Sequence, residues 1–227
     1  MLISVCAAYV LSAHIKWEWR VALSGVSALA LFEIVQSNSI QGIAVTFFGG
    51  SLAIYFYLRA KYQNHLPSLT FLLASSTVGI FGILGALQKG PLDFIYKKSV
   101  SLRGTYWQTG INIGNDHPLT GVGMDSYGDW YRAYRPPVAL IDTPGPKVVT
   151  NAAHNVFLDL FAYGGYPLLI AYLALMLWCA FAALKVIARL QKSYDPLFVA
   201  LLAIWSTYLL QSMISINQIG LAIWGWS

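Results

Sequence analysis

The sequence predicts an all-α, polytopic integral membrane protein, in which a helical bundle carries one large extracytoplasmic loop with short interfacial helices. Hydrophobic residues make up 57% of the 227 residues and charged residues only 10%, whereas a soluble domain carries about 25% charged residues. Several apolar runs are long enough to cross a hydrocarbon core of about 30 Å as helices. The connections between these runs alternate between short segments rich in Lys and Arg and segments that are either uncharged or very long.

The apolar runs divide the chain into three parts. Residues 1–88 hold transmembrane helices, residues 89–153 form the loop, and residues 154–227 hold an interfacial helix followed by the C-terminal transmembrane helices. The expected helices lie at 2–13, 21–36, 40–58, 69–88, 167–185, 196–214 and 219–227. Because the first and last of these are too short to span a bilayer, we expect the chain to be a fragment clipped at both ends.

The distribution of cations predicts the orientation of the chain in the membrane. Three short connections, His14–Arg20, Arg59–Pro67 and Lys185–Asp195, are rich in Lys and Arg, whereas Gln36–Gly42 has no charged residue. The positive-inside rule places the three basic connections in the cytoplasm. The long segment 89–153 then lies on the opposite side, and its seven Lys and Arg residues do not contradict the rule because long loops translocate largely regardless of charge.

The long loop has its own expected structure. Residues 99–113 have a loosely helical apolar pattern, and Met124, Tyr127, Tyr131 and Tyr134 recur at helical spacing. Pro136-Pro137 should end this second helix, and clusters of turn-forming residues occur at 117–123 and 142–146.

The first candidate for chemistry is His154, at the junction between the loop and an apolar helix. Asn155 is a good N-cap for a short helix over Val156–Tyr163, and Gly164-Gly165 should end that helix before Pro167 begins the next one. A helix N-terminus favours anions and keeps a nearby imidazole neutral, so that it can accept a proton near pH 7. The alternative is that His154 is only an interfacial capping residue.

Three arginines of the loop, Arg103, Arg132 and Arg135, are candidates for binding an anionic substrate. A guanidinium binds phosphate oxygens in a bidentate manner and stays charged at any physiological pH. Arginines beside the outer leaflet are therefore suited to the pyrophosphate of a lipid-linked donor. The alternative for each is contact with lipid headgroups or pairing with Asp125 or Asp129.

The remaining patterns exclude several classes of function. Cys6 and Cys179 lie in apolar runs, so they do not indicate a disulfide framework. The net charge of +5 does not form one solvated patch, and we expect no nucleic-acid partner. No metal-ligand spacing, Walker loop, dinucleotide fingerprint or nucleophile elbow occurs, so we expect neither a metal nor a cofactor.

In combination, the loop motifs resemble the O-antigen ligase family, which includes the O-antigen polymerases and the protein O-oligosaccharyltransferases. The resemblance rests on Arg103–Trp107, on the HPLTGVG segment His117–Gly123, and on His154-Asn155 followed by Gly164-Gly165. In the family these motifs lie in a large periplasmic loop between two late membrane helices. The resemblance covers roughly residues 37–227.

The resemblance implies a metal-independent glycosyltransferase of lipopolysaccharide biosynthesis, multi-pass in the bacterial inner membrane and active on its periplasmic face. It would transfer a glycan from undecaprenyl pyrophosphate to a hydroxyl of a glycolipid acceptor, the lipid A-core, or of a protein acceptor. His154 matches the loop histidine that activates or positions the acceptor, and Arg103 matches a loop arginine that contacts the donor pyrophosphate.

Five further residues are expected to bind substrate, and they are Arg132, Arg135, Asn155, Trp107 and Gln41. Trp107 belongs to the loop aromatics that could stack on sugar rings, although membrane anchoring is an equal alternative. Gln41 marks a departure from the family, because Ser39–Gly42 has Gln where many members have an arginine.

Two alternatives to a ligase remain open. The chain could instead be an O-antigen polymerase or a protein O-oligosaccharyltransferase, which use the same donor chemistry. From another class, it could be a non-catalytic transporter or a polysaccharide-assembly subunit. Transporters tend to place charged residues at mid-membrane, whereas here the spanning runs are nearly free of charge and the polar residues collect in one loop.

Overall fold

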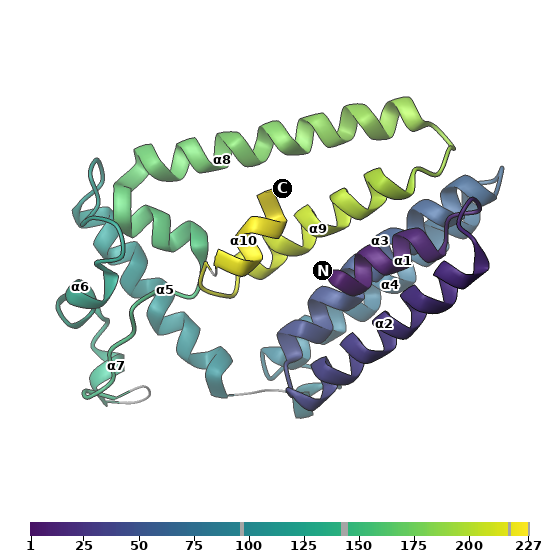
Figure 1. Ribbon diagram of the computed structural model, residues 1–227. Coiled ribbons are helices and arrows are strands. Elements are labelled where there is room, and N and C mark those ends of the chain that lie inside the picture. Colours follow the sequence, from purple (N-terminus) through teal and green to yellow (C-terminus); the bar gives the residue numbers. More distant parts are fainter. Residues whose placement is uncertain (96–97, 142–144, 218, 227) are drawn as a thin grey trace. The chain divides into compact units, whose positions relative to one another are not determined.

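The computed structural model describes residues 1–95, 98–141, 145–217 and 219–226 (Figure 1). The described residues form helices and no strands, which confirms the predicted all-α class. The elements are α1 (Leu2–Val10), α2 (Trp17–Gln36), α3 (Ile40–Lys61), α4 (Leu66–Ala86), the 3₁₀ helix η1 (Asp93–Ile95), α5 (Lys98–Asp116), α6 (Tyr127–Tyr134), α7 (Val138–Ile141), α8 (Val156–Leu190), α9 (Pro196–Ser212) and α10 (Ile219–Trp226).

These helices form two compact units. The first unit comprises residues 1–95, 183–211 and 220–227, and the second comprises residues 96–182 and 212–219. The first unit therefore holds α1 to α4 and α9, together with the last turns of α8. The second unit holds the loop helices α5 to α7 and most of α8.

In the first unit, α1 to α4 run in alternating directions as neighbours (Figure 1). The core between α1, α3 and α9 consists largely of small residues, including Ala8, Ala53 and Ala200. Gly49 of α3 lies so close to its neighbours that a Cβ there would be 2.0 Å from Ser4 Oγ. Small residues of this kind let membrane helices approach closely, which is the usual way that such helices pack.

Three of the described helices are long and apolar enough to cross a membrane, namely α3, α4 and α8. They correspond to the spans expected at 40–58, 69–88 and 167–185. The runs expected at 21–36 and 196–214 are also helical, as α2 and α9, but α9 is a shorter apolar helix and α2 is not among the three candidate spans. The predicted polytopic membrane bundle is thus confirmed.

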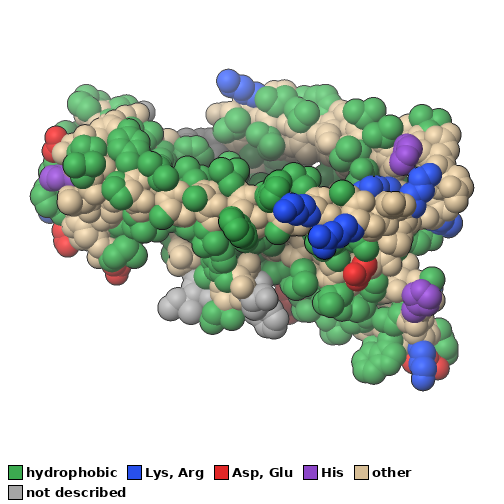
Figure 2. Space-filling model, turned by 90° about the horizontal axis from the view of Figure 1, so that it is seen from above, with side chains coloured by type: hydrophobic (Ala, Val, Ile, Leu, Met, Phe, Trp, Pro, Cys, Tyr) green, Lys and Arg blue, Asp and Glu red, His purple; other side chains and the backbone are tan. Residues whose placement is uncertain are grey.

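The three basic connections meet at one end of the first unit. The Lys192 ammonium donates a hydrogen bond to the main-chain carbonyl of Gln63, which joins the α8–α9 connection to the α3–α4 connection. Tyr194 donates to the Ala8 carbonyl at 2.7 Å and thereby brings in α1. Figure 2 shows Lys, Arg and His side chains gathered at this end of the unit. This shared location agrees with the prediction that the three connections lie on one side of the membrane.

In the second unit, both helices expected in the loop are present. The pattern at 99–113 corresponds to α5, and the tyrosines at helical spacing form α6, which ends at Tyr134 ahead of Pro136-Pro137. Part of the turn cluster expected at 142–146 lies outside the described residues, since 142–144 are not among them.

The helix α8 is broken at Gly164-Gly165, as predicted. Gly164 has φ −137° and ψ 16°, and Gly165 has φ 62° and ψ −159°, so neither continues the helix. A segment over Val156–Tyr163 therefore precedes the long apolar helix, which begins near Pro167.

The turn that follows α5 is docked on this break. Val122 N–H donates to the Ala162 carbonyl at 2.9 Å, and Tyr166 N–H donates to the Pro118 carbonyl at 2.7 Å. These bonds satisfy main-chain groups that the break removes from the helical pattern. A Cβ on Gly165 would lie 2.3 Å from the Pro118 oxygen, so glycine is required by contact as well as by its positive φ. The His117–Gly123 segment thus has a structural role at the break.

Candidate active site

The site is centred on His154, which lies at the end of the loop just before α8. Its imidazole stacks on the ring of Tyr106 from α5, with ring centroids 5.6 Å apart and an angle of 26° between the planes. Arg103 is one helical turn before Tyr106 on α5, and its charge acts on the His154 ring. The structure therefore places Arg103 within electrostatic range of His154, and both are residues that the sequence singles out for chemistry.

The surroundings of His154 favour its neutral form. Burial lowers the pKa of His154 below its usual value of 6.5, and the nearby positive charge of Arg103 lowers this pKa further. Burial also lowers the pKa of Arg103, but a guanidinium still remains charged throughout the physiological range. At neutral pH the pair thus consists of an imidazole able to accept a proton and a fixed cation.

The backbone at His154 has a left-handed conformation, with φ 58°. This conformation is costly for a residue with a Cβ, and it persists only where the surroundings impose it. Asn155 supplies one such constraint, because its side-chain oxygen accepts from the N–H groups of Phe157 at 3.0 Å and Leu158 at 3.3 Å. The prediction of Asn155 as an N-cap is thus confirmed. Its amide nitrogen also donates to the Met213 carbonyl at 3.0 Å.

Asp159 supplies a second constraint and was missed by the sequence analysis. Its carboxylate is only 5% exposed, and its Oδ1 accepts a 2.6 Å hydrogen bond from the main-chain N–H of Ala153. The residue immediately before His154 is therefore fixed to the first turns of α8. An acidic residue in the apolar stretch Val156–Phe161 was the available signal, since buried acids in such stretches require a partner.

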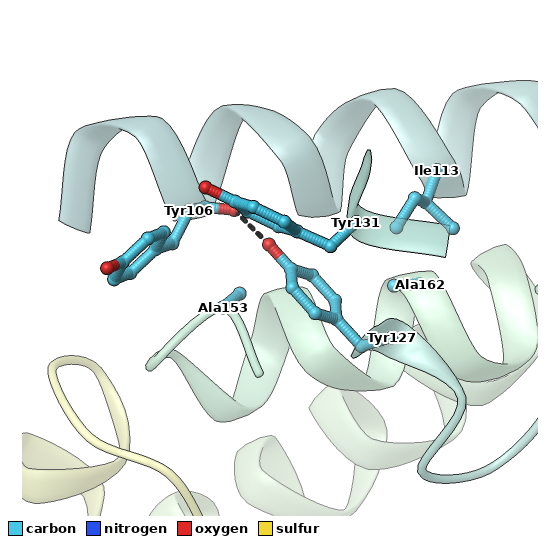
Figure 3. Packing of buried hydrophobic residues seen from close by; sticks show 6 residues of the cluster. All are labelled: Tyr106, Ile113, Tyr127, Tyr131, Ala153 and Ala162. Carbon is cyan, nitrogen blue, oxygen red and sulfur yellow. Dashed lines mark hydrogen bonds between the residues drawn. The ribbon is translucent and has the colours of Figure 1, made fainter. Parts of the chain in front are cut away.

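A cluster of buried tyrosines supports the face of α5 on which His154 stacks. Tyr127 and Tyr131 of α6 are fully buried beside Tyr106. The Tyr127 hydroxyl donates a 2.6 Å hydrogen bond to the Tyr106 carbonyl, and Figure 3 shows this hydroxyl directed to the main chain of α5, with Ala153 beside the same group of rings. Burial raises the pKa of Tyr127, so this hydroxyl remains a hydrogen-bond donor. The short helix α6 thus packs against the part of α5 that carries Tyr106 and supports the ring on which His154 stacks.

The other residues predicted to bind substrate lie in several different parts of the structure. Trp107 packs against the tyrosine cluster. Arg135 places its guanidinium 6.0 Å from the Tyr131 ring and donates to the Pro146 carbonyl at 3.0 Å. Arg132 is exposed on α6, and among the described residues no hydrogen bond or ion pair joins it to His154. Gln41 lies in the first turn of α3, in the first unit, where Ser39 caps the helix.

His117 belongs to a separate aromatic group at the end of α5. Its ring meets Trp130 edge-on at 5.2 Å between centroids, and its Nε2 is 3.2 Å from the Tyr134 hydroxyl. Tyr134 in turn donates to the Asp116 carboxylate. These contacts give His117 a structural role at the end of α5.

The described residues contain no group of three or more His, Cys, Asp or Glu side chains able to hold a metal ion. A neutral imidazole can take a proton from a hydroxyl, and a guanidinium beside it can stabilise negative charge on an oxygen.

The chain also matches a known protein family. The family model described as O-Antigen ligase matches residues 1–173, a stretch that includes Arg103, His117–Gly123 and His154-Asn155 and ends within α8. No curated protein and no solved structure matched the chain. Since the family match covers well over half of the sequence, the chain belongs to the O-antigen ligase family of membrane glycosyltransferases in polysaccharide biosynthesis.

Proposed function

We propose that this protein transfers a glycan from undecaprenyl pyrophosphate to a hydroxyl of the lipid A-core on the periplasmic face of the bacterial inner membrane. The single observation that carries the proposal is that His154 stacks on the ring of Tyr106 within electrostatic range of Arg103. The family membership supports a ligase-type glycosyl transfer in general.

The proposed reaction forms one bond to the anomeric carbon as it breaks another. The acceptor oxygen forms a bond to the anomeric carbon of the donor glycan, and the bond from that carbon to the pyrophosphate oxygen breaks. The electron pair leaves with undecaprenyl pyrophosphate, and the hydroxyl proton passes to an unprotonated nitrogen of His154. General-base assistance of this kind contributes about 10²–10⁴-fold to a rate.

Arg103 has the second role in the proposal. Negative charge grows on the pyrophosphate oxygen as the bond to the sugar breaks, and a fixed cation placed there lowers the barrier. Because the guanidinium supplies this charge, the proposed reaction needs no divalent ion. Transfer should therefore proceed undiminished in EDTA, and a requirement for added Mg²⁺ or Mn²⁺ would contradict this part of the proposal.

The test is glycan transfer by purified protein in lipid nanodiscs, with a lipid-linked oligosaccharide donor and a lipid A-core acceptor. His154→Ala should lower the rate by at least about 10²-fold, whereas the matched variant His65→Ala, in the α3–α4 connection, should act as the unaltered protein does. Equal rates for His154→Ala and the unaltered protein would remove His154 from the reaction.

The same assay separates the related activities by their products. Glycan on lipid A-core supports the ligase, a ladder of repeats on the carrier lipid indicates a polymerase, and glycan on a pilin-like protein indicates protein glycosylation. Uptake of a labelled solute without any transfer would instead support the transporter alternative.

The proposed orientation has an independent test. The gathering of the basic connections at one end of the first unit supports their placement in the cytoplasm. In a cysteine-free background, a cysteine at position 147 should react with an impermeant reagent added outside spheroplasts, and one at position 191 should not. Labelling of position 191 alone would reverse the orientation and place the site in the cytoplasm.

A further inference from the structure

A surface cavity lies in the second unit, on a different face of α5 from the one that carries Arg103 and Tyr106. It has a volume of about 630 Å³ and lies between α5 and the segment from Ala133 to Pro137 at the end of α6. Ligand sites in proteins have volumes of about 300–1,000 Å³. All its lining residues belong to the second unit, so its geometry is internal to that unit.

Hydrogen-bonding side chains dominate the cavity wall. Gln108, Asn112 and Asn115 follow one another at spacings of four and three residues, which places their carboxamides along one face of α5. Asp116 adds a carboxylate from the same helix. Arg135 lies in the opposite wall, and its guanidinium contacts the Tyr131 ring and the Pro146 carbonyl, neither of which lines the cavity. The cavity thus offers several donors and acceptors together with one carboxylate.

This set of groups selects a neutral, hydroxyl-rich ligand. A carboxamide both donates and accepts, and a carboxylate accepts two hydrogen bonds, so these groups match neighbouring hydroxyls that also donate and accept. A phosphate would be disfavoured by Asp116, and an apolar ligand would displace water from the exposed Asn115 side chain without replacing its hydrogen bonds. Among the substrates of a glycosyl transfer, the sugar rings have the matching chemistry.

The wall is held in place before any ligand arrives. Gln108 Nε2 donates to Asn112 Oδ1 at 2.9 Å, and Asn112 Nδ2 donates to the Tyr134 carbonyl at 2.9 Å. Two prolines, Pro136 and Pro137, stiffen the opposite side. Binding sites that are fixed in advance lose less entropy when the ligand is bound.

We infer that the cavity between α5 and the end of α6 binds an oligosaccharide segment of one of the two substrates, away from the bond that reacts. The inference rests on the proposed glycan transfer. The segment belongs either to the donor glycan beyond its first sugar or to the outer sugars of the acceptor. Both sources present the same hydroxyl chemistry, so the experiment has one arm for each.

The test is the transfer assay with the double variant Gln108→Ala/Asn115→Ala. Both side chains are exposed and lie on a helix, so alanine should leave the fold intact. Loss of these hydrogen bonds should raise the KM of one substrate roughly tenfold while kcat changes less than twofold. Titrating the donor at fixed acceptor, and then the acceptor at fixed donor, identifies the substrate whose sugars enter the cavity.

Two controls make the result specific. Asp129→Ala removes an exposed side chain of α6 that does not line the cavity, and it should leave both KM values unchanged. With a donor carrying a single sugar, or an acceptor lacking its outer sugars, the effect of the double variant on that substrate should disappear. An effect that persists with the truncated substrate would overturn the inference.

Failure of this inference differs from failure of the proposed function. If both KM values are unchanged in the double variant while His154→Ala abolishes transfer, the cavity does not bind glycan and the proposed function stands. If the unaltered protein transfers nothing, saturation-transfer NMR decides the cavity alone, first with the oligosaccharide released from the donor by mild acid and then with the oligosaccharide released from the lipid A-core. Signals of either oligosaccharide that weaken in the double variant support glycan binding there, and equal signals for both overturn it.

Discussion

The main-chain N–H of Ala153 donates a 2.6 Å hydrogen bond to the carboxylate of Asp159, six residues further along the chain. Both partners are buried: Ala153 is completely buried, and Asp159 is 5% exposed. Together with the capping bonds of Asn155, this contact fixes the backbone on both sides of His154. The backbone that carries the imidazole is therefore fixed by side chains at the start of α8, whereas the ring itself stacks on Tyr106 of α5.

Replacing Asp159 with alanine should weaken both the fold and the reaction. The buried N–H of Ala153 would lose its acceptor, at a cost of about 1–3 kcal/mol, and His154 would lose one of its constraints. Asp159→Asn keeps an oxygen acceptor and should retain most of the transfer rate. Thermal unfolding in detergent and the transfer assay measure the two effects, with Asp129→Asn on the exposed surface of α6 as the control. Similar transfer rates for Asp159→Ala and the unaltered protein would contradict this role.

The left-handed backbone of His154 can be tested separately from its side chain. His154→Gly and His154→Ala both remove the imidazole, so both should lose transfer. Because glycine adopts φ 58° without strain, His154→Gly should unfold at a higher temperature than His154→Ala, with a difference of about 1 kcal/mol in the free energy of unfolding. If alanine is the more stable of the two, the backbone conformation described for this residue is wrong.

The lowered pKa of His154 predicts a specific dependence on pH. The unfolded chain takes up a proton near the usual pKa of 6.5, whereas the folded protein does so only at lower pH. In that interval the unfolded state binds more protons, so the contribution of His154 to folding stability falls as pH falls. For the same reason the acidic limb of the pH profile of kcat/KM should lie below pH 6.5.

Arg103 contributes to this shift through its charge. Arg103→Met should move the acidic limb to higher pH, although not to the usual value, because burial is the larger cause. Arg103→Lys keeps the charge and should leave the limb nearly in place, even where the rate itself falls. An identical limb in Arg103→Met and in the unaltered protein would show that the two side chains do not interact.

The glycine break in α8 should tolerate no side chain. At Gly165 a methyl group would meet the Pro118 carbonyl, and the backbone conformation is one that other residues rarely adopt, so Gly165→Ala should cost about 2–4 kcal/mol. Gly104 of α5 has open space around its Cβ position, and Gly104→Ala should be neutral or stabilise by up to about 1 kcal/mol. Thermal unfolding of the two variants side by side gives the comparison, and equal stabilities would count against the docked break.

Much of the local structure could be predicted because it depends on neighbouring residues. The helical pattern at 99–113 is present as α5, Asn155 caps the first turn of α8, and Gly164-Gly165 interrupts that helix. Apolar periodicity, capping preferences and glycine conformations are properties of short segments, so the sequence alone contains them. The pairing of Arg103 with His154 came from the family resemblance, and in the structure the charge of Arg103 lowers the pKa of His154.

The contacts that complete the site could not be predicted in the same way. From the sequence, Asp159 is only an acidic residue in a short interfacial helix. Its hydrogen bond with the Ala153 N–H depends on the path of the loop, which the sequence does not give. Likewise, Tyr127 and Tyr106 are 21 residues apart, and only the packing of α6 on α5 joins them. Arg132 and Arg135 look alike in sequence, yet only Arg135 packs on the tyrosine cluster. Such distinctions depend on tertiary structure.

The docking of Pro118 on Gly165 limits how members of this family can be recombined. A chimera that imports a foreign loop as far as residue 153 would pair one protein's proline turn with another protein's glycine break. The carbonyls of Ala162 and Tyr163 would then lie against a foreign turn, which need not supply the N–H groups that Val122 and Gly123 supply here. Exchanges intended to alter acceptor choice should therefore extend from α5 past Tyr166, so that the turn and the glycine break come from the same protein.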